Sequence, residues 1–179
     1  MSDDGAIGLA PPDVSSSVTL EDLTALSPMV FQIGLSIGRN RSFAEDVVQE
    51  TMLKAWRNLD GFRGDAPVRI WVARIANNTA ISMLRRQRDQ PTDPGSLSEV
   101  AGAATQLPAR TAEGRAMLDE LWEALDRLDP VSRSIVVLRE LEAMSYEDVA
   151  AALQLPLPTV KTRLFRARRE LSKQLEHWR

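Results

Sequence analysis

The stretch from residue 145 to residue 174 constrains the fold more than any other part of the chain. Ser145, with Asp148 three residues later, marks the start of a helix. Pro156 and Pro158 end that helix, because proline fixes φ and moves the preceding residue out of the helical region. A second helix is expected to begin near Pro158, since proline suits a first turn. Two short helices separated by a tight turn predict a helix-turn-helix unit.

The second of these helices has two chemically different faces. Its apolar side chains share one narrow stripe that must be buried: Val160, Leu164, Ala167 and Leu171. The opposite face and its flanks are basic and polar: Thr162, Arg166, Arg169 and Lys173, with Lys161, Arg163 and Arg168 beside them. Glu170 is the only acid against six basic residues between Lys161 and Lys173, so pairing within the helix cannot neutralise them. A solvated helix is the alternative, but this imbalance favours DNA binding. Phe165 could contact a thymine methyl group or pack against the preceding helix.

Composition and charge exclude several classes of function. The chain has 179 residues, enough for one ordinary domain or two small ones. It has no cysteine, which removes disulfides and cysteine zinc sites, and its single histidine, His177, is expected to be solvated. No apolar run could span a bilayer and no signal-peptide pattern is present, so we expect a cytoplasmic protein without membrane insertion of its own. Because the net charge is −3, nucleic-acid binding must come from local basic patches.

No pattern in the sequence indicates catalysis. The acidic pairs Glu45–Asp46 and Glu147–Asp148 lie at expected helix starts, where capping and the helix dipole account for them. The sequence contains no metal-ligand cluster, phosphate-binding glycine loop or nucleophile arrangement. We therefore expect no enzyme activity and no cofactor.

Two stretches of biased composition divide the chain. Residues 1–18 have the composition of a disordered tail, and residues 91–111 have that of a flexible linker. The segments 19–90 and 112–179 show helical periodicities and no convincing alternating pattern of a strand. The predicted fold class is therefore all-α, with two small helical domains joined by a flexible linker.

One helix of the first domain suggests a protein–protein contact. It is expected to begin at Ser42, with Glu45 at the capping-box position. Its wheel predicts a broad buried face bordered by Met52 and Trp56, and a polar face that carries Asp46, Gln49, Glu50, Leu53 and Arg57. A leucine among acids and an amide resembles an apolar anchor inside a polar rim, as at protein interfaces. Scattered exposed leucines are nevertheless common, so an ordinary surface position is the alternative.

The loop 60–66 and the helix expected from Pro67 to about Arg88 form a second candidate DNA surface. Phe62 could stack on an exposed base while Arg63 holds its phosphate, or Phe62 could be a hydrophobic plug beneath an ordinary turn. The helix turns Trp71, Val72, Ile75, Thr79 and Met83 inward. Another side projects Arg74, Asn77, Asn78, Ile81, Arg85 and Arg88. Asparagine is a poor helix former, so paired amides beside arginines indicate contacts to base edges and phosphates, with a solvated surface as the alternative.

Longer motifs in both domains resemble one bacterial protein family. AEDVVQETMLKAWRNLDGFRG followed by RIWVARIANNTAISMLRRQR is similar to region 2 of the extracytoplasmic-function (ECF) sigma factors. LDELWEALDRLDPVSRSIVVLRELEAMSYEDVAAAL followed by PTVKTRLFRARREL is similar to their region 4. The resemblance covers most of the chain. The sequence departs from the family at Pro158, where glycine is usual, and at Val68-Arg69-Ile70, where more apolar residues are common.

The resemblance implies a role for each surface. It implies that core RNA polymerase is bound by Asp46, Gln49, Glu50, Leu53 and Arg57. It implies that the −10 promoter element is recognised and opened by Phe62, Arg63, Arg74, Asn77, Asn78, Arg85 and Arg88. It implies that the −35 element is read by Thr159, Lys161, Thr162, Arg163, Phe165, Arg166, Arg169 and Lys173. Family members are commonly held inactive by an anti-sigma factor, which we therefore expect as a further partner.

Proteins of two other classes share some of these features. A promoter-independent repressor or activator would also carry a helix-turn-helix, but it would leave the Leu53 face and the Asn77–Asn78 stripe without a role. An adaptor that titrates an anti-sigma factor without touching DNA would not need a helix so rich in lysine and arginine. A sigma factor accounts for both surfaces.

Overall fold

The computed structural model describes residues 18–89 and 112–176. Within these ranges every regular element is a helix, which confirms the predicted all-α fold class. Most of the expected tail, the expected linker and His177 lie outside the described residues.

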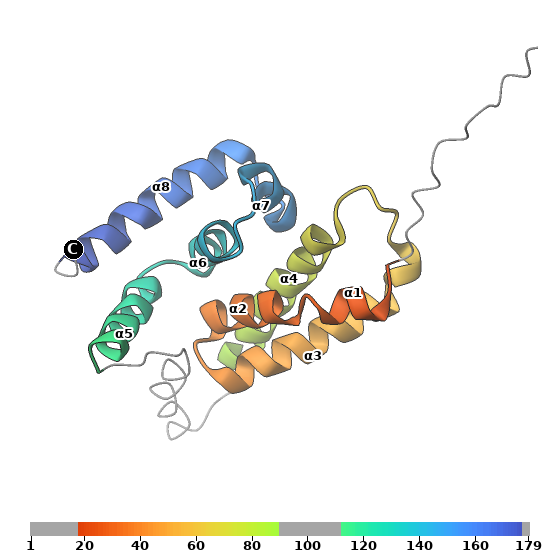
Figure 1. Cartoon of the computed structure of the whole chain (residues 1–179), viewed down its shortest axis with the longest axis horizontal. Coiled ribbons are helices and arrows are strands. Elements are labelled where there is room, and N and C mark those ends of the chain that lie inside the picture. The colour runs from red at the N-terminus through yellow and green to blue at the C-terminus, as the bar shows by residue number, and fades with distance from the viewer. Residues whose placement is uncertain (1–17, 90–111, 177–179) are drawn as a thin grey trace, which may run out of the picture.

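The first domain is a bundle of helices that carries its main contacts between α2, α3 and α4 (Figure 1). Its elements are α1 (Leu20–Thr24), α2 (Ser27–Gly38), α3 (Arg41–Arg57), η1 (Leu59–Gly61) and α4 (Val68–Asp89). Apolar side chains of α2 fill the centre, where Val30 and Ile33 are fully buried. Val47 of α3 and Val72 of α4 are also fully buried and belong to the same core.

The start of α3 differs from the expected one. Asn40, not Ser42, is the N-cap, and its Oδ1 accepts a hydrogen bond of 2.6 Å from the backbone N–H of Phe43. Arg39, which precedes it, has a φ of 62° and ends α2 in the left-handed region. Glu45 therefore does not complete a capping box and instead accepts a charged hydrogen bond from Arg41 Nε at 2.6 Å. Asparagine is as good a cap as serine, so local propensity did not separate the two candidates.

The second domain contains the predicted helix-turn-helix. Its elements are α5 (Ala112–Asp126), α6 (Pro130–Val136), η4 (Val137–Leu141, a π-helical turn), α7 (Tyr146–Leu153) and α8 (Leu157–Gln174). Ser145 caps α7 as expected, because its hydroxyl accepts a hydrogen bond from the Asp148 N–H at 3.0 Å. Gln154 ends α7 in the left-handed region with φ 55°. Helix α8 begins at Leu157, one residue before Pro158, near which the second helix was expected. Both helices of the unit are confirmed.

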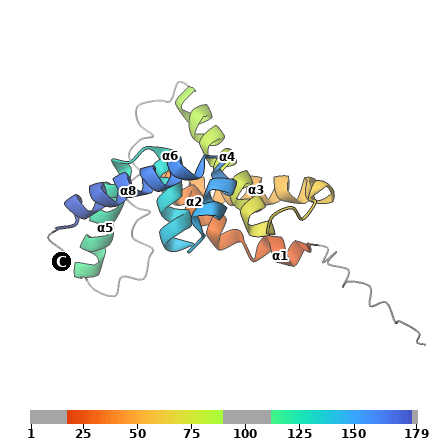
Figure 2. The same cartoon turned by 90° about the horizontal axis from the view of Figure 1, so that it is seen from above.

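The two domains pack against each other. Helix α4 lies against α7, and α2 lies against α6 and η4, while α5 lies beside α8 (Figure 1, Figure 2). Buried residues of both domains belong to one hydrophobic cluster that runs from Leu23 to Ala167. The sequence did not predict this arrangement.

Candidate nucleic-acid interfaces

The outer face of α8 is exposed and basic, as its periodicity predicts. Val160, Leu164 and Ala167 are buried against the rest of the second domain. The exposed face carries Lys161, Thr162, Phe165, Arg166, Arg168, Arg169 and Lys173, with Thr159 and Arg163 half-buried at its edge. The side chain of Phe165 is 62% exposed, so most of its surface is open to a ligand.

Two arginines of α8 are neutralised by carboxylates far away in the sequence. Arg163 donates from Nη1 to both carboxylate oxygens of Asp129, at 3.0 and 3.1 Å. Arg168 donates to Glu140 Oε1 from Nε at 3.0 Å and from Nη2 at 2.6 Å. Within the part of the chain that the structure describes, Arg166, Arg169 and Lys173 form no ion pair. The uncompensated positive charge of the helix is therefore concentrated on these three residues and Lys161.

Asp129 holds both a helix end and an arginine. Its Oδ1 accepts hydrogen bonds of 3.1 Å from the N–H groups of Val131 and Ser132, which caps α6. Partial burial raises the pKa of Asp129, but the hydrogen bonds from Ser132 and the charge of Arg163 outweigh it and keep the pKa below its usual value. Beside this carboxylate, an open groove of about 630 Å³ lies between α8 and the turn before α6, and its lining includes Asp129, Thr162, Arg163, Arg166 and Glu170.

The polar face of α3 is exposed and contains more apolar surface than the sequence predicts. Asp46, Gln49 and Arg57 are exposed, and Glu50 forms an ion pair of 3.1 Å with Lys54. Leu53 is 43% exposed. Trp56, expected at the border of the buried face, is 52% exposed and lies one helical turn further on. Leu53 and Trp56 together form the apolar centre of a polar face, which fits the anchor pattern of protein interfaces.

The loop after η1 supports the plug interpretation of Phe62 more than the base-stacking one. Its ring is half-buried and lies 5.0 Å from the ring of Trp71, centroid to centroid, at an interplanar angle of 41°. Arg63 is exposed. Next to this aromatic pair lies an open groove of about 610 Å³ lined by Lys54, Asn58, Gly61, Trp71, Ile75, Asn78, Thr79 and Ser82. In this groove the Asn78 amide and Lys54 lie beside the apolar side chains of Trp71 and Ile75.

The stripe expected along α4 is only partly free. Asn78, Arg85 and Arg88 are exposed. The expected placement of Asn77 is wrong, because this side chain is only 6% exposed and its Oδ1 accepts a hydrogen bond of 2.7 Å from the Ser134 hydroxyl of α6. Arg74 is half-buried and donates to the Ala151 carbonyl of α7 at 3.0 Å. Both side chains point to the second domain, which no wheel of α4 alone could show.

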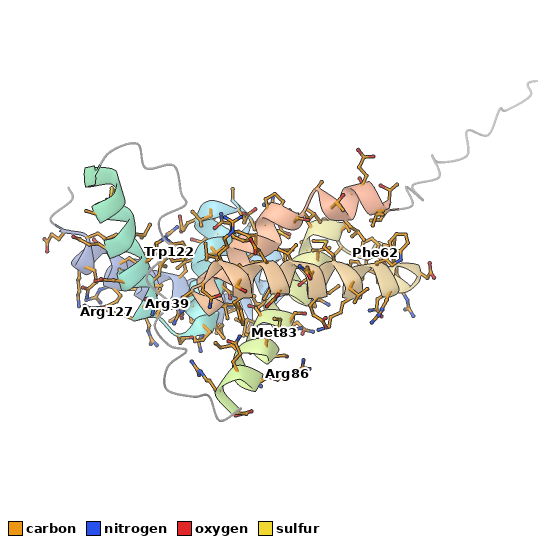
Figure 3. The ribbon with its side chains drawn as sticks, turned by 90° about the horizontal axis from the view of Figure 1, so that it is seen from below. Arg39, Phe62, Met83, Arg86, Trp122 and Arg127 are labelled. Carbon is orange, nitrogen blue, oxygen red and sulfur yellow. The ribbon has the colours of Figure 1, made fainter. Side chains whose placement is uncertain are left out.

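Further polar contacts join the two domains. Arg69 of α4 donates from Nη2 to a Glu142 carboxylate oxygen at 2.6 Å and to the Glu142 carbonyl at 2.8 Å. Arg133 of α6 donates to the Ser36 carbonyl of α2 at 3.1 Å, and Arg39 forms an ion pair with Asp126. Burial raises the pKa of Asp126 more than Arg39 and Arg133 lower it. Figure 3 shows Arg39 at the end of the first domain nearest to α5, which carries Trp122, and Phe62 at the opposite end.

Comparison with known proteins defines the class of these two domains. Residues 23–90 match the family model of sigma-70 region 2, and residues 118–171 match that of sigma-70 region 4. Two regions of this type in this order are those of a promoter-recognition subunit of RNA polymerase. Within the described residues, no helix is long and apolar enough to cross a membrane.

Curated relatives narrow the class to one family. The ECF RNA polymerase sigma-E factor of Haemophilus influenzae is 34% identical over 145 residues, which cover 76% of this chain and 77% of that protein. The RNA polymerase sigma-H factor of Pseudomonas aeruginosa is 36% identical over 141 residues, which cover 74% and 73%. The chain therefore belongs to the ECF sigma factors, which are non-catalytic subunits of RNA polymerase.

Two solved structures have the same fold over both domains. The sigma factor RpoE from Bartonella quintana, in complex with the anti-sigma factor NepR, has a TM-score of 0.65 and 25% identity, covering 87% of this chain and 95% of that one. CnrH, in complex with the cytosolic domain of CnrY, has a TM-score of 0.64 and 28% identity, covering 88% and 86%. Residues 19–90 and 112–179 are called region 2 and region 4 below.

Proposed function

We propose that this sigma factor binds core RNA polymerase through α3, captures the −10 element on region 2 and reads the −35 element with α8. The observation that carries the proposal is the outer face of α8. Lys161, Arg166, Arg169 and Lys173, which form no ion pair within the described residues, lie with the exposed Phe165 on one side of a helix whose other side is buried. Such a helix fits the major groove, where basic side chains contact phosphates and guanine edges and an aromatic ring contacts thymine methyl groups.

The −35 surface comprises the residues expected from the sequence: Thr159, Lys161, Thr162, Arg163, Phe165, Arg166, Arg169 and Lys173. Arg166 and Arg169 are the strongest candidates for base or phosphate contacts, since they are exposed and form no ion pair among the described residues. Arg163 contributes differently, because Asp129 holds Nη1 and leaves its other N–H groups for DNA. The groove beside it is lined by Arg127, Arg163 and Arg166, which could contact a phosphate backbone.

The −10 surface is centred on the groove beside Trp71. An unpaired base in this groove would face the Asn78 amide and the apolar side chains of Trp71 and Ile75. Lys54 would be close to its phosphate. Extruding a base costs a few kcal/mol of stacking, which hydrogen bonds to its edge and contact with the aromatic wall would offset. Arg63, Arg85 and Arg88 are exposed and extend this surface along the strand.

Core RNA polymerase is the partner for the polar face of α3. Leu53 and Trp56 supply the apolar anchors, and Asp46, Gln49, Glu50 and Arg57 supply the surrounding rim. Residues that contribute most of the binding energy of an interface are typically such central anchors, surrounded by a rim that excludes water. We also propose an anti-sigma factor as partner, since the similar RpoE was solved in complex with the anti-sigma factor NepR, and a cytoplasmic location, where polymerase works.

Run-off transcription with purified core RNA polymerase on a promoter library tests the whole proposal. We expect transcripts from a subset of promoters that share −35 and −10 motifs, and none from core enzyme alone. The matched control is the chain with α8 disabled by Arg166→Ala and Arg169→Ala, which should still bind the polymerase but lose the −35 motif. Absence of association and of initiation with the intact chain would refute the proposal.

A further inference from the structure

The ring of Tyr146 lies against two basic side chains of region 4. The Cζ atom of Arg139, on η4, is 5.0 Å from the centre of the ring, and the Nζ atom of Lys161, on α8, is 5.7 Å from it. Both distances are within the range of a cation–π contact, which extends to about 6 Å. Tyr146 is the first residue of α7, so its side chain links three successive elements of region 4.

The ring is fixed by contacts other than the one to Lys161. Tyr146 is half-buried and packs against the hydrophobic core. Arg139 donates from Nη1 to the Met144 carbonyl at 2.9 Å, which holds its guanidinium beside the start of α7. Hydrogen bonds to Glu140 raise the pKa of the Arg168 guanidinium, and the nearby Tyr146 hydroxyl raises it further. The position of the ring therefore does not depend on Lys161.

Lys161 keeps its full charge in this contact. It forms no ion pair with any described residue, whereas Arg163 and Arg168 of the same helix are paired with Asp129 and Glu140. A carboxylate orients a basic side chain but also cancels the charge that attracts DNA. An aromatic ring orients an ammonium group through its quadrupole and leaves the charge in place. Because lysine has three N–H donors, the exposed Lys161 retains donors for a phosphate.

We propose that Tyr146 is a positioning residue for −35 recognition, whose ring places the Lys161 ammonium group for contact with a DNA phosphate. The inference rests on the proposed −35 role of α8 and adds to it a residue of α7 that acts through Lys161. A lysine side chain has many rotamers, and part of the binding free energy is lost in immobilising them. A lysine that is already held on a ring loses less, so its contact with DNA is stronger.

The experiment compares two replacements of the tyrosine in the complete holoenzyme. Tyr146→Phe retains the ring and removes the hydroxyl, whereas Tyr146→Leu retains an apolar side chain and removes the ring. Full-length variants are assembled with core RNA polymerase, and fluorescence anisotropy gives their affinity for a promoter duplex selected in the transcription assay. The same duplex with an altered −35 element gives the background. The ratio of the two affinities then measures −35 recognition alone.

We expect Tyr146→Leu to lower this ratio about two- to fivefold, the size of an exposed cation–π contact, and Tyr146→Phe to leave it within about twofold. Lys161→Gln should lower the ratio at least as much as Tyr146→Leu does. Adding Tyr146→Leu to Lys161→Gln should bring no further loss, because the ring then has no ammonium group to place. Lys173→Gln is the matched background, since Lys173 lies about three turns further along α8. There, Tyr146→Leu should cost as much as in the unmodified chain.

A second measurement needs no substitution of the tyrosine. In nuclear magnetic resonance spectra of the unmodified full-length chain, the ε-methylene protons of Lys161 should be shifted upfield by the ring current of Tyr146. The ε-methylene protons of Lys173 give the reference position for an exposed lysine of the same helix. Equal shifts for the two lysines would overturn the inference, whether or not the Tyr146→Leu chain folds.

Three results of the binding assay would also contradict the positioning role. The first is a Tyr146→Leu chain that recognises the −35 element as well as the unmodified chain. The second is a loss that persists in the Lys161→Gln background, because the tyrosine would then act through the fold or through Arg139. The third is an equal loss in the Phe and Leu variants, which would assign the effect to the hydroxyl. Failure of the proposed function is seen separately, since the unmodified holoenzyme would then bind both duplexes equally, and the inference would fail with it.

Discussion

At the scale of single residues, the arginines of α8 are not equivalent. Arg163 and Arg168 are held by Asp129 and Glu140, whereas Arg166 and Arg169 have no carboxylate partner among the described residues. An arginine without a partner can give its donors to DNA without first breaking an ion pair. We therefore expect the energy of −35 recognition to depend mainly on the unpaired arginines.

Arg166→Ala tests this difference. We expect a loss on the order of 1–3 kcal/mol in binding to the −35 element if Arg166 contacts a base edge, with relaxed preference at that position. Electrophoretic mobility shifts of the holoenzyme on promoters with intact and altered −35 elements measure it. Arg168→Ala is the matched control and should cost less. Equal binding by the Arg166 variant and the unmodified chain would remove Arg166 from the site.

Leu53→Ala and Trp56→Ala test the anchors on α3. Truncating an interface anchor typically costs more than about 1 kcal/mol, so we expect at least several-fold weaker binding to core polymerase with the fold intact. Competition against a labelled sigma factor for core enzyme gives the affinity. Leu141→Ala is a suitable control, since Leu141 is also exposed, at 62%, but lies on η4 of region 4. Similar losses in all three variants would contradict a specific α3 interface.

At the scale of elements, the corner between α2 and α3 depends on a glycine. A Cβ atom at Gly38 would lie 1.9 Å from the Phe43 ring, which is itself buried at the start of α3. The ring thus occupies the space that any side chain at position 38 would need. The Phe43 ring therefore fixes the angle at which α3 leaves α2.

Gly38→Ala should therefore destabilise region 2. We expect a loss of about 1–3 kcal/mol in the free energy of unfolding, typical of an overpacked core. Urea unfolding followed by circular dichroism measures it. Gly61→Ala is the matched control, because nothing lies within 4 Å of a Cβ there. A Gly38 variant as stable as the Gly61 variant would show that the corner adjusts at no cost.

The start of α6 depends on Asp129 in a pH-dependent way. Asp129→Ala should cost about 1 kcal/mol of stability at neutral pH through loss of the N-cap, whereas Asp129→Asn keeps most of the cap. The pKa of Asp129 is lowered in the folded protein, so its contribution is present above the unfolded-state pKa of about 3.9 and is lost as pH falls through the folded value. Denaturant titrations at several pH values should show the alanine deficit shrinking below about pH 4. A deficit that stays constant to low pH would exclude the charged carboxylate as its cause.

At the scale of the whole molecule, we expect promoter choice to depend on the separation of regions 2 and 4. In this structure α4 packs against α7, and Asn77, expected on the −10 surface, is buried against Ser134. We expect binding to the polymerase to hold the two regions at one fixed distance. We expect each region alone to make few phosphate contacts, so that its binding to DNA weakens with salt. A fixed distance between the regions would then raise the effective concentration of the second contact once the first is made.

Insertion of about five base pairs between the −35 and −10 elements tests this geometry. Half a helical turn of about 10 base pairs moves the −35 element to the opposite side of the duplex, so we expect initiation to fall at least tenfold. Run-off transcription from the altered promoters measures it, with substitutions that preserve the spacer length as the control. Unchanged initiation would mean that the regions act independently.

The sequence by itself determined the helices and the chemistry of their faces. Caps and prolines act within a few residues, so the helix-turn-helix, the buried stripe of α8 and its basic face could all be predicted from local patterns. The family motifs are equally local, and the family assignment was confirmed. Even the misplaced α3 cap was wrong by only two residues, because Asn40 and Ser42 are chemically similar caps.

Only the tertiary structure decided which of these surfaces are free. Asn77 meets Ser134 across 57 positions of sequence, and Arg163 meets Asp129 across 34. A helical wheel assigns a side chain to a face, but the burial of that face depends on which distant element packs there. For the same reason the wheel placed Trp56 at a buried border and Asn77 in solvent, whereas packing exposes the first and covers the second.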